Sequence, residues 1–145
     1  MIPTTPPSSP PGPRVLLYSD DRSIRDRVRA ALGTRLLPES AATEYAEAAT
    51  AGAAVAEVER GSIDLVIADG ETAPLGGMGL ARQLRDEIKP CPPIIVLLGR
   101  RDDRWLARWS GADGAVPLPV DPFELSRMAV ELLERAATKQ HDAAS

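Results

Sequence analysis

Short apolar runs and stretches with helical spacing alternate five times along this chain, and that alternation limits its possible folds more than any other feature. The runs predicted to be strands occupy residues 14–18, 44–48, 63–69, 94–98 and 115–118. Apolar residues recur at helical spacing after each run, and Gly or Pro ends most of the helical stretches. Strands that alternate with helices pair in parallel through right-handed crossovers, with helices on both faces of the sheet. The sequence therefore predicts a single α/β domain with a parallel five-stranded sheet.

The run 63–69 carries the first candidate for chemistry, Asp69, at its end. A continuous apolar run bounded by turn residues is typical of a strand buried on both faces. In an open α/β sheet, ligands bind beyond the carboxyl ends of such strands. Asp69 would then face a ligand site. The alternative is that its carboxylate only starts a turn or caps the next segment.

Composition excludes several classes of protein. The 145 residues fit one domain, and a hydrophobic fraction of 43% with 26% charged residues is ordinary for a soluble globular protein. A net charge of −4 without a basic block disfavours nucleic-acid binding. The single Cys excludes a disulfide framework, and the single histidine, His141, lies in the polar C-terminal segment, away from any core nucleophile. Without a long apolar segment or a secretion signal, the sequence predicts a cytoplasmic protein.

The two ends differ from the predicted domain at 14–137. Residues 1–13 are rich in Pro and uncharged, which predicts an extended, disordered arm. This arm is either a dispensable leader or a segment that lies along a partner. Residues 138–145 are predicted to be a flexible tail.

Three local features sharpen these predictions. Ser23 is expected to cap the first helix, and the Gly-rich stretch 70–79 is expected to be a flexible loop without a phosphate-loop motif. Trp105 and Trp109 lie on one face of a short helix that follows the charged segment 100–104. They either cover the edge of the sheet or face outward as an anchor, and we expect one buried and one partly exposed.

Four stretches in order resemble the receiver domain of bacterial two-component response regulators. They are residues 14–21 (RVLLYSDD), 63–69 (IDLVIAD), 93–99 (PIIVLLG) and 111–125 (GADGAVPLPVDPFEL). The resemblance extends from residue 14 to about 135. It implies a flavodoxin-like (βα)5 fold with strand order 2-1-3-4-5.

The resemblance also implies functional positions. The phosphate-accepting aspartate of the family falls on Asp69, and the acid pair that helps to hold Mg²⁺ falls on Ser19 and Asp20, so that one acid is missing. Asp20 and Asp69 would bind Mg²⁺ only weakly, and no other cofactor is implied.

Three further family positions have lost their functional groups. The hydroxyl at the end of the fourth strand falls on Leu98, the lysine at the end of the fifth falls on Leu118, and the aromatic switch falls on Ala115. A phosphorylated aspartate needs cations and hydrogen-bond donors, which leucines do not supply. The site therefore resembles a degenerate receiver site.

Three hypotheses about function follow. The first is a non-enzymatic pseudo-receiver that binds a protein partner through the fourth helix, fifth strand and fifth helix, with candidate contacts at Trp105, Trp109, Arg100, Arg101 and Arg104. The second is a single-domain response regulator phosphorylated on Asp69 in a phosphorelay. The third is a binder of a small ligand under the Gly-rich loop.

A narrower resemblance concerns the partner. Residues 69–79, 91–93 and 105–110 are similar to orphan response regulators of mycobacteria and related actinobacteria, a group linked with respiratory complex I, the NADH:quinone oxidoreductase. This resemblance implies an accessory subunit at the cytoplasmic face of the plasma membrane. The lack of a long apolar segment and of a basic block separately predicts no membrane span and no nucleic-acid partner.

Overall fold

The five predicted strands and five helices are all present in the computed structural model. The structure describes residues 10–144, with side chains as far as Lys139. In chain order the elements are β1 (Arg14–Tyr18), α1 (Arg22–Leu32), β2 (Glu44–Ala48), α2 (Ala51–Glu59), β3 (Leu65–Asp69), α3 (Gly77–Glu87), β4 (Ile94–Leu98), the short 3₁₀ helix η1 (Arg101–Asp103), α4 (Arg104–Trp109), β5 (Gly114–Pro117) and α5 (Pro122–Ala144).

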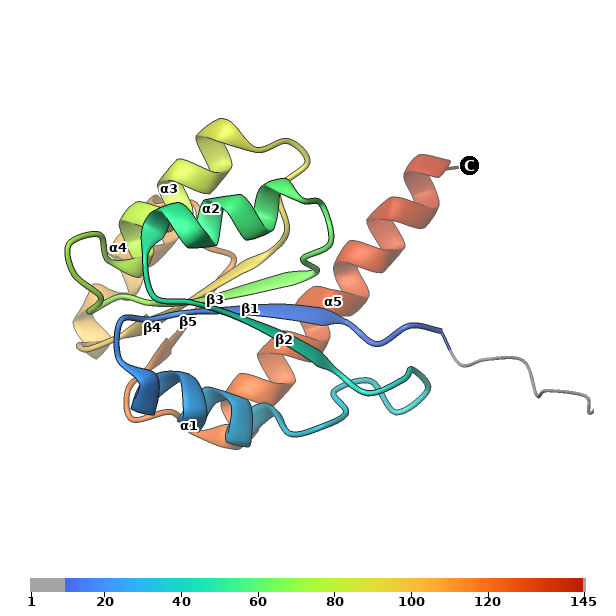
Figure 1. Cartoon of the computed structure of the whole chain (residues 1–145), viewed down its shortest axis with the longest axis horizontal. Coiled ribbons are helices and arrows are strands. Elements are labelled where there is room, and N and C mark those ends of the chain that lie inside the picture. The colour runs from blue at the N-terminus through green and yellow to red at the C-terminus, as the bar shows by residue number, and fades with distance from the viewer. Residues whose placement is uncertain (1–9, 145) are drawn as a thin grey trace, which may run out of the picture.

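The strands form one parallel sheet in the order β2-β1-β3-β4-β5. This confirms the predicted fold class and strand order. Figure 1 shows α2, α3 and α4 on one face of the sheet and α1 and α5 on the other. All five residues of β3 and of β4 are buried, as continuous apolar runs in a doubly covered sheet require. Asp69, the last residue of β3, is therefore held at the end of the best-buried part of the sheet.

Alternate residues of each strand supply two separate halves of the core. Leu16 and Tyr18 of β1 join the cluster beneath α2 and α3, whereas Val15 and Leu17 join the cluster with α1 and α5. This follows from the two-residue period of a strand, which sends successive side chains to opposite faces. Both halves meet at the sheet and fix the register of β1 against β3.

Two helix starts differ from the sequence prediction. Asp21 caps α1 instead of Ser23, because its Oδ1 accepts from the Ser23 N–H at 2.8 Å and from the Ser23 hydroxyl at 2.7 Å. The Gly-rich stretch is a loop only as far as residue 76, since α3 begins at Gly77. A Cβ on Gly77 would lie 2.6 Å from the Ala68 carbonyl oxygen, so glycine lets this helix start press against β3.

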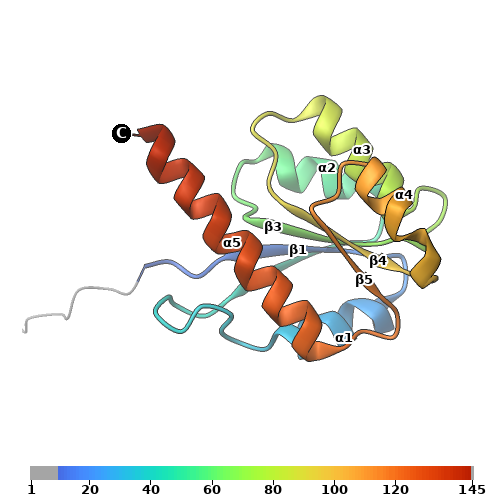
Figure 2. The same ribbon diagram turned by 180° about the vertical axis from the view of Figure 1, so that it is seen from behind.

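The domain boundaries differ at both ends. Helix α5 continues to Ala144, so residues 138–144 of the predicted tail are helical. No Gly or Pro interrupts 123–144, so nothing stops the helix, whose last turns project beyond the sheet in Figures 1 and 2. Of the predicted arm, residues 1–9 lie outside the described residues. Residues 10–13 are not free, because the carbonyls of Pro10 and Pro13 accept from the N–H groups of Ala41 and Glu44 at 2.9 Å each.

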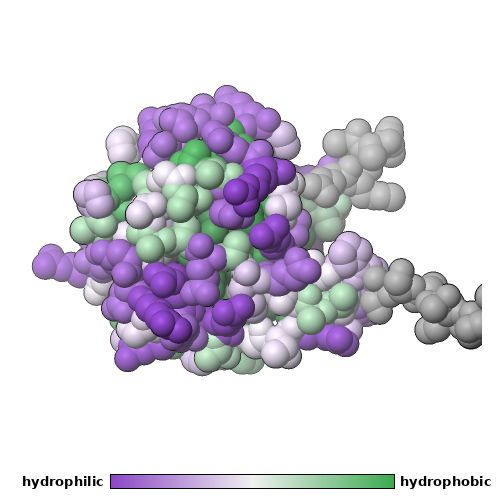
Figure 3. Space-filling model, viewed as in Figure 1, coloured by the Kyte–Doolittle hydropathy of each residue, from purple (hydrophilic) through white to green (hydrophobic). Residues whose placement is uncertain are grey.

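The hydropathy of the surface differs from one helix to the next. Figure 3 shows hydrophilic residues gathered over α1 and over the end of α3, with the Ala-rich α2 forming a paler, more apolar band between them. Within the described part of the chain, no helix is long and apolar enough to cross a membrane.

Candidate functional site

The carboxyl ends of β1 and β3 bring Ser19 and Asp69 together. The register pairs Tyr18 with Ala68, so the next residue of each strand lies at the same edge of the sheet. Ser19 is 1% exposed and Asp69 is 3% exposed. Asp69 thus lies at the strand end where the sequence predicts it, beside a second polar side chain.

Both carboxylate oxygens of Asp69 accept hydrogen bonds from neutral groups of the chain itself. The Ser19 hydroxyl donates to Oδ2 at 2.7 Å, and the Glu71 N–H donates to Oδ1 at 2.9 Å. The Ser19 oxygen in turn accepts from the Asp21 N–H at 3.0 Å. The bond to Glu71, two residues on, is an Asx turn. Asp69 thus adopts the turn-forming role that the sequence left open as an alternative, and Ser19 binds to it as a donor.

Asp20 is directed at the loop that follows β3. Its Oδ2 accepts from the Ala73 N–H at 3.3 Å, and its own N–H donates to the Thr72 hydroxyl at 3.3 Å. Thr72 is buried and was not singled out from the sequence, which gives no sign of a partner 52 residues away. These two hydrogen bonds tie the loop to the end of β1.

Tyr18 adds a third attachment for the same loop. Its hydroxyl donates to the Leu75 carbonyl oxygen at 2.6 Å. Burial raises the pKa of Tyr18, and the nearby carboxylates of Asp20 and Asp69 raise it further. The phenol therefore keeps its proton and remains a donor.

The first part of this loop uses its backbone N–H groups within the chain. The N–H groups of Glu71, Thr72 and Ala73 donate to the Asp69 carboxylate, the Asp69 carbonyl and the Asp20 carboxylate, respectively. A phosphate-binding loop needs several free N–H groups that point to one place. Residues 71–73 therefore do not form such a site, whereas α3 begins at Gly77 without a side-chain cap.

The two carboxylates predicted to hold Mg²⁺ are engaged by the chain itself in this structure. Among the described residues, no group of three or more His, Cys, Asp or Glu side chains is placed to hold a metal. Mg²⁺ takes an octahedron of oxygens and usually keeps one or two carboxylates together with waters and phosphate. Asp20 and Asp69, the two carboxylates predicted to hold the metal, each already accept hydrogen bonds from the chain.

The neighbouring strand ends contribute apolar side chains. Leu98 ends β4 and is 1% exposed, while Leu118 follows β5 and is half-buried. The sequence predicts Leu118 as the last residue of that strand, but β5 ends at Pro117. The Leu118 N–H donates to the Leu98 carbonyl oxygen at 2.7 Å. This backbone bond continues the pairing of the two strands. Neither side chain offers a charge or a donor to this edge of the sheet.

A second candidate surface lies on α4 and the start of α5. Trp105 and Trp109 are 67% and 71% exposed, so the expectation that one would be buried is wrong. The physical reason is that α4 packs on the sheet through Ala107, which is 1% exposed, and leaves both indoles outside. Phe123 is 75% exposed as well, although its place in the apolar pattern of the last helix predicts a packing residue.

Arginines accompany these aromatic side chains. The Arg82 guanidinium of α3 lies over the Trp109 ring, 5.3 Å from its centroid, which is a cation–π contact. Arg104 forms an ion pair with Glu124 of α5 at 3.7 Å. Arg100 and Arg101 are exposed beside the start of α4. The structure thus groups the predicted partner-binding residues around one short helix and adds Phe123 to them.

Comparisons with known proteins agree with the fold. No protein-family model matches the chain. The chain is 51% identical over 131 residues to an uncharacterized response regulatory protein found in two strains of Mycobacterium tuberculosis, and the match covers 90% of this chain and 98% of that protein.

Solved structures share the same architecture. A CheY-like response regulator receiver domain protein from Methanospirillum hungatei matches with a TM-score of 0.71 at 24% identity, covering 88% of this chain and 98% of the other. The receiver domain of a Francisella response regulator matches with a TM-score of 0.73 at 21% identity, covering 86% and 99%. At these identities the likeness concerns the fold alone.

Proposed function

The chain belongs to the response regulator family, and we propose that its receiver domain has lost the phosphorylation switch and serves as a protein-docking module. In this proposal the protein is not an enzyme. It acts through a surface that stays available whether or not Asp69 is modified.

The observation that carries the proposal is the state of the Asp69 carboxylate. Its two oxygens are buried and already bonded to the Ser19 hydroxyl and the Glu71 N–H. A phosphoryl group added there would bring negative charge into a site whose adjoining strand ends carry Leu98 and Leu118. Such charge in a buried site is costly without a cation or a preorganised donor. Ala115 also leaves no aromatic side chain to change rotamer in response.

The docking surface is supported by the exposure of Trp105, Trp109 and Phe123. Large apolar side chains that remain in solvent on one part of a surface commonly mark protein contacts. Trp, Tyr and Arg are also the residues that most often dominate binding energy at interfaces.

Phosphorylation can be tested directly. The protein is incubated with acetyl phosphate and Mg²⁺, and its intact mass is measured. We expect no added phosphoryl group on the wild type or on the Asp69→Asn variant. A variant that restores the family residues, Ser19→Asp with Leu98→Thr and Leu118→Lys, is expected to gain one and serves as the positive control. A Mg²⁺-dependent phosphoryl group on the wild type that Asp69→Asn abolishes would contradict the proposal.

That contradicting result would support a second candidate, a single-domain response regulator in a phosphorelay. Asp69 keeps the position of the family's phosphoacceptor at the end of β3, and Asp20 follows the adjacent strand β1. The second candidate requires the loop at 70–76 to release Asp20 so that a metal can bind.

The partner proposed from the sequence resemblance is respiratory complex I, with the protein as an accessory subunit at the cytoplasmic face of the plasma membrane. A tagged protein is recovered with mild detergent from the membrane fraction of its own cells, and its partners are identified by mass spectrometry. Wild type and Asp69→Asn should recover the same complex in equal amount. A Trp105→Ala, Trp109→Ala variant should lose it. Recovery of no membrane complex by the wild type would remove the complex I assignment.

A further inference from the structure

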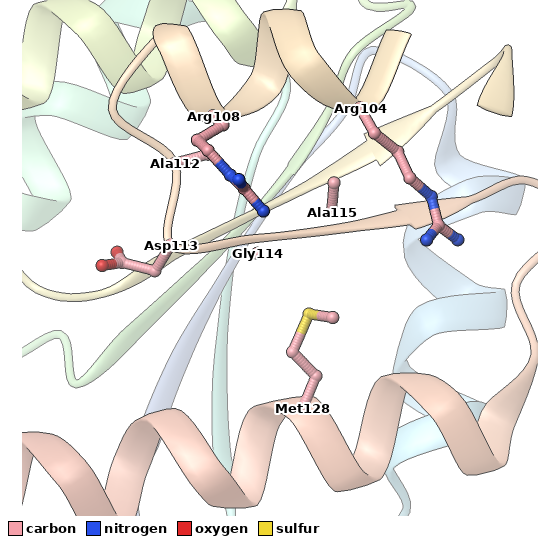
Figure 4. A pocket seen from close by; sticks show the side chains of 7 residues that line it. All are labelled: Arg104, Arg108, Ala112, Asp113, Gly114, Ala115 and Met128. Carbon is pink, nitrogen blue, oxygen red and sulfur yellow. The ribbon is translucent and has the colours of Figure 1, made fainter. Parts of the chain in front are cut away.

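A pocket of about 250 Å³ lies between α4, β5 and α5. Figure 2 shows α4 and α5 on either side of β5, and Figure 4 shows the pocket itself. Arg104 and Arg108 reach into it from α4, Gly114 and Ala115 form its floor on β5, and Met128 reaches up from α5. Asp69, Ser19 and Asp20 are not among the residues that line it.

The pocket has a cation without an acidic partner. Asp113 forms its ion pair with Arg85 of α3, and Figure 4 shows its carboxylate pointing away from the pocket. Glu124 forms its ion pair with Arg104. Within the side chains that the structure describes, no carboxylate lies within 4.0 Å of the Arg108 guanidinium. In Figure 4 that guanidinium extends from α4 across the opening of the pocket.

The rest of the lining is apolar and adaptable. The side chain of Ala115 is a single methyl group and leaves space above β5, and Gly114 lies so close to the Met128 thioether that a Cβ there would collide with it. Methionine fills irregular spaces and adjusts its shape on contact. A group that enters would meet a guanidinium at the rim and methyl and thioether surfaces below.

The size of the pocket decides what kind of occupant fits. Small-molecule sites typically enclose roughly 300–1,000 Å³ and cover most of the ligand. A space of about 250 Å³ is enough for one side chain but small for a separate ligand. The exposed indoles of Trp105 and Trp109, on the same helix as Arg108, favour a protein surface as the source of that side chain.

We propose that this pocket receives an acidic side chain of a partner protein, with the carboxylate on Arg108 and a neighbouring apolar residue against Ala115 and Met128. The inference rests on the proposed docking function and specifies the chemistry of the partner. A carboxylate on a guanidinium can form two parallel hydrogen bonds, which gives direction as well as affinity. The aromatic side chains outside the pocket would supply apolar contact area around this anchor.

A peptide selection tests the proposal before any partner protein is identified. Random linear peptides displayed on phage are selected on the immobilised full-length protein, and the enriched peptides are synthesised. We expect them to carry Asp or Glu next to a large apolar residue. Changing that Asp to Asn, or that Glu to Gln, should weaken binding about tenfold, which corresponds to ~1.4 kcal/mol.

Variants of the protein locate the contact. Arg108→Gln should weaken the selected peptides about tenfold, and Ala115→Phe should weaken them by filling the pocket. Arg27→Gln removes the same charge from the exposed face of α1, away from the pocket and from the docking surface, and should change binding less than about twofold. Because Arg108 is exposed, its variant should fold normally, and a thermal melt verifies this for each protein.

Other outcomes separate this inference from the docking proposal. Peptides that lose binding with Trp105→Ala but are indifferent to Arg108→Gln would overturn the acidic anchor and leave docking through α4 intact. If substitutions on α4 weaken none of the selected peptides, both the acidic anchor and docking through α4 are overturned. Benzoate serves as a probe for a free carboxylate ligand. If benzoate alone binds the pocket as tightly as the peptides, the protein source of the acid is wrong.

Discussion

The hydrogen bond from Ser19 to Asp69 makes a quantitative prediction for Ser19→Ala. The substitution leaves Asp69 Oδ2 without its 2.7 Å donor at a residue that is 3% exposed. Hydrogen bonds to charged groups contribute roughly 1.5–3 kcal/mol, and a buried acceptor without a partner costs a similar amount. The Asp21 N–H also loses an acceptor, but Asp21 is exposed and water can replace it. We therefore expect the free energy of unfolding to fall by about 2 kcal/mol.

Urea unfolding followed by circular dichroism measures this change. For a chain of this size the same loss lowers Tm by roughly 4–8 °C. The matched control is Ser62→Ala, in which an exposed serine loses an interaction with Arg14. The free energy of unfolding of Ser62→Ala should stay within about 0.5 kcal/mol of the wild-type value. Asp69→Asn should cost less than Ser19→Ala, because the amide can still accept from Glu71 and can donate to the Ser19 oxygen.

A double-mutant cycle isolates the pair. In an Asp69→Ala background the Ser19 hydroxyl has lost its partner, so Ser19→Ala should then cost under about 1 kcal/mol. If Ser19→Ala instead leaves the unfolding free energy of the wild type unchanged, water must satisfy Asp69. The account of the site as closed and internally bonded would then be refuted.

The remaining predictions concern other parts of the domain. The pKa of Tyr18 is raised in the folded state, so above about pH 10 the folded protein binds more protons than the unfolded chain, and the free energy of unfolding should fall as pH rises. Tyr18→Phe should reduce that fall when urea unfolding is repeated across this pH range. An unchanged pH profile in the variant would contradict the raised pKa. Gly33 ends α1 with φ of 76°, so Gly33→Ala should lose about 1 kcal/mol. Gly52→Ala in α2 meets no neighbouring atom and should gain about 0.5 kcal/mol by the same unfolding measurement; equal effects at the two glycines would refute the conformational argument. Burial raises the pKa of the Cys91 thiol, so at neutral pH iodoacetamide should react with Cys91 more slowly than it reacts with the thiol of free glutathione. Equal rates for the two thiols would count against burial of Cys91.

The sequence by itself determined the architecture. Strand–helix alternation, the apolar runs at 63–69 and 94–98 and the punctuation by Gly and Pro are local signals, and each element that they predict is present. The parallel sheet follows from that alternation, and the strand order from the family resemblance. The apolar run at 63–69 placed Asp69 at a strand end, and the family resemblance singled out Ser19 as a position of the same site.

Only the tertiary structure decided which groups those side chains meet. Asp20 binds the backbone of Ala73, and the pocket at Arg108 draws its lining from three elements, so neither follows from residue spacing. The exposure of Trp105 and Trp109 depends on how a helix of six residues rests on Ala107. Hydrophobic periodicity specifies what a segment must bury and leaves open the polar partners at its ends. Those partners are chosen by the packing of segments far apart in the chain, and in this protein they close the site at Asp69 and leave the surface around α4 open.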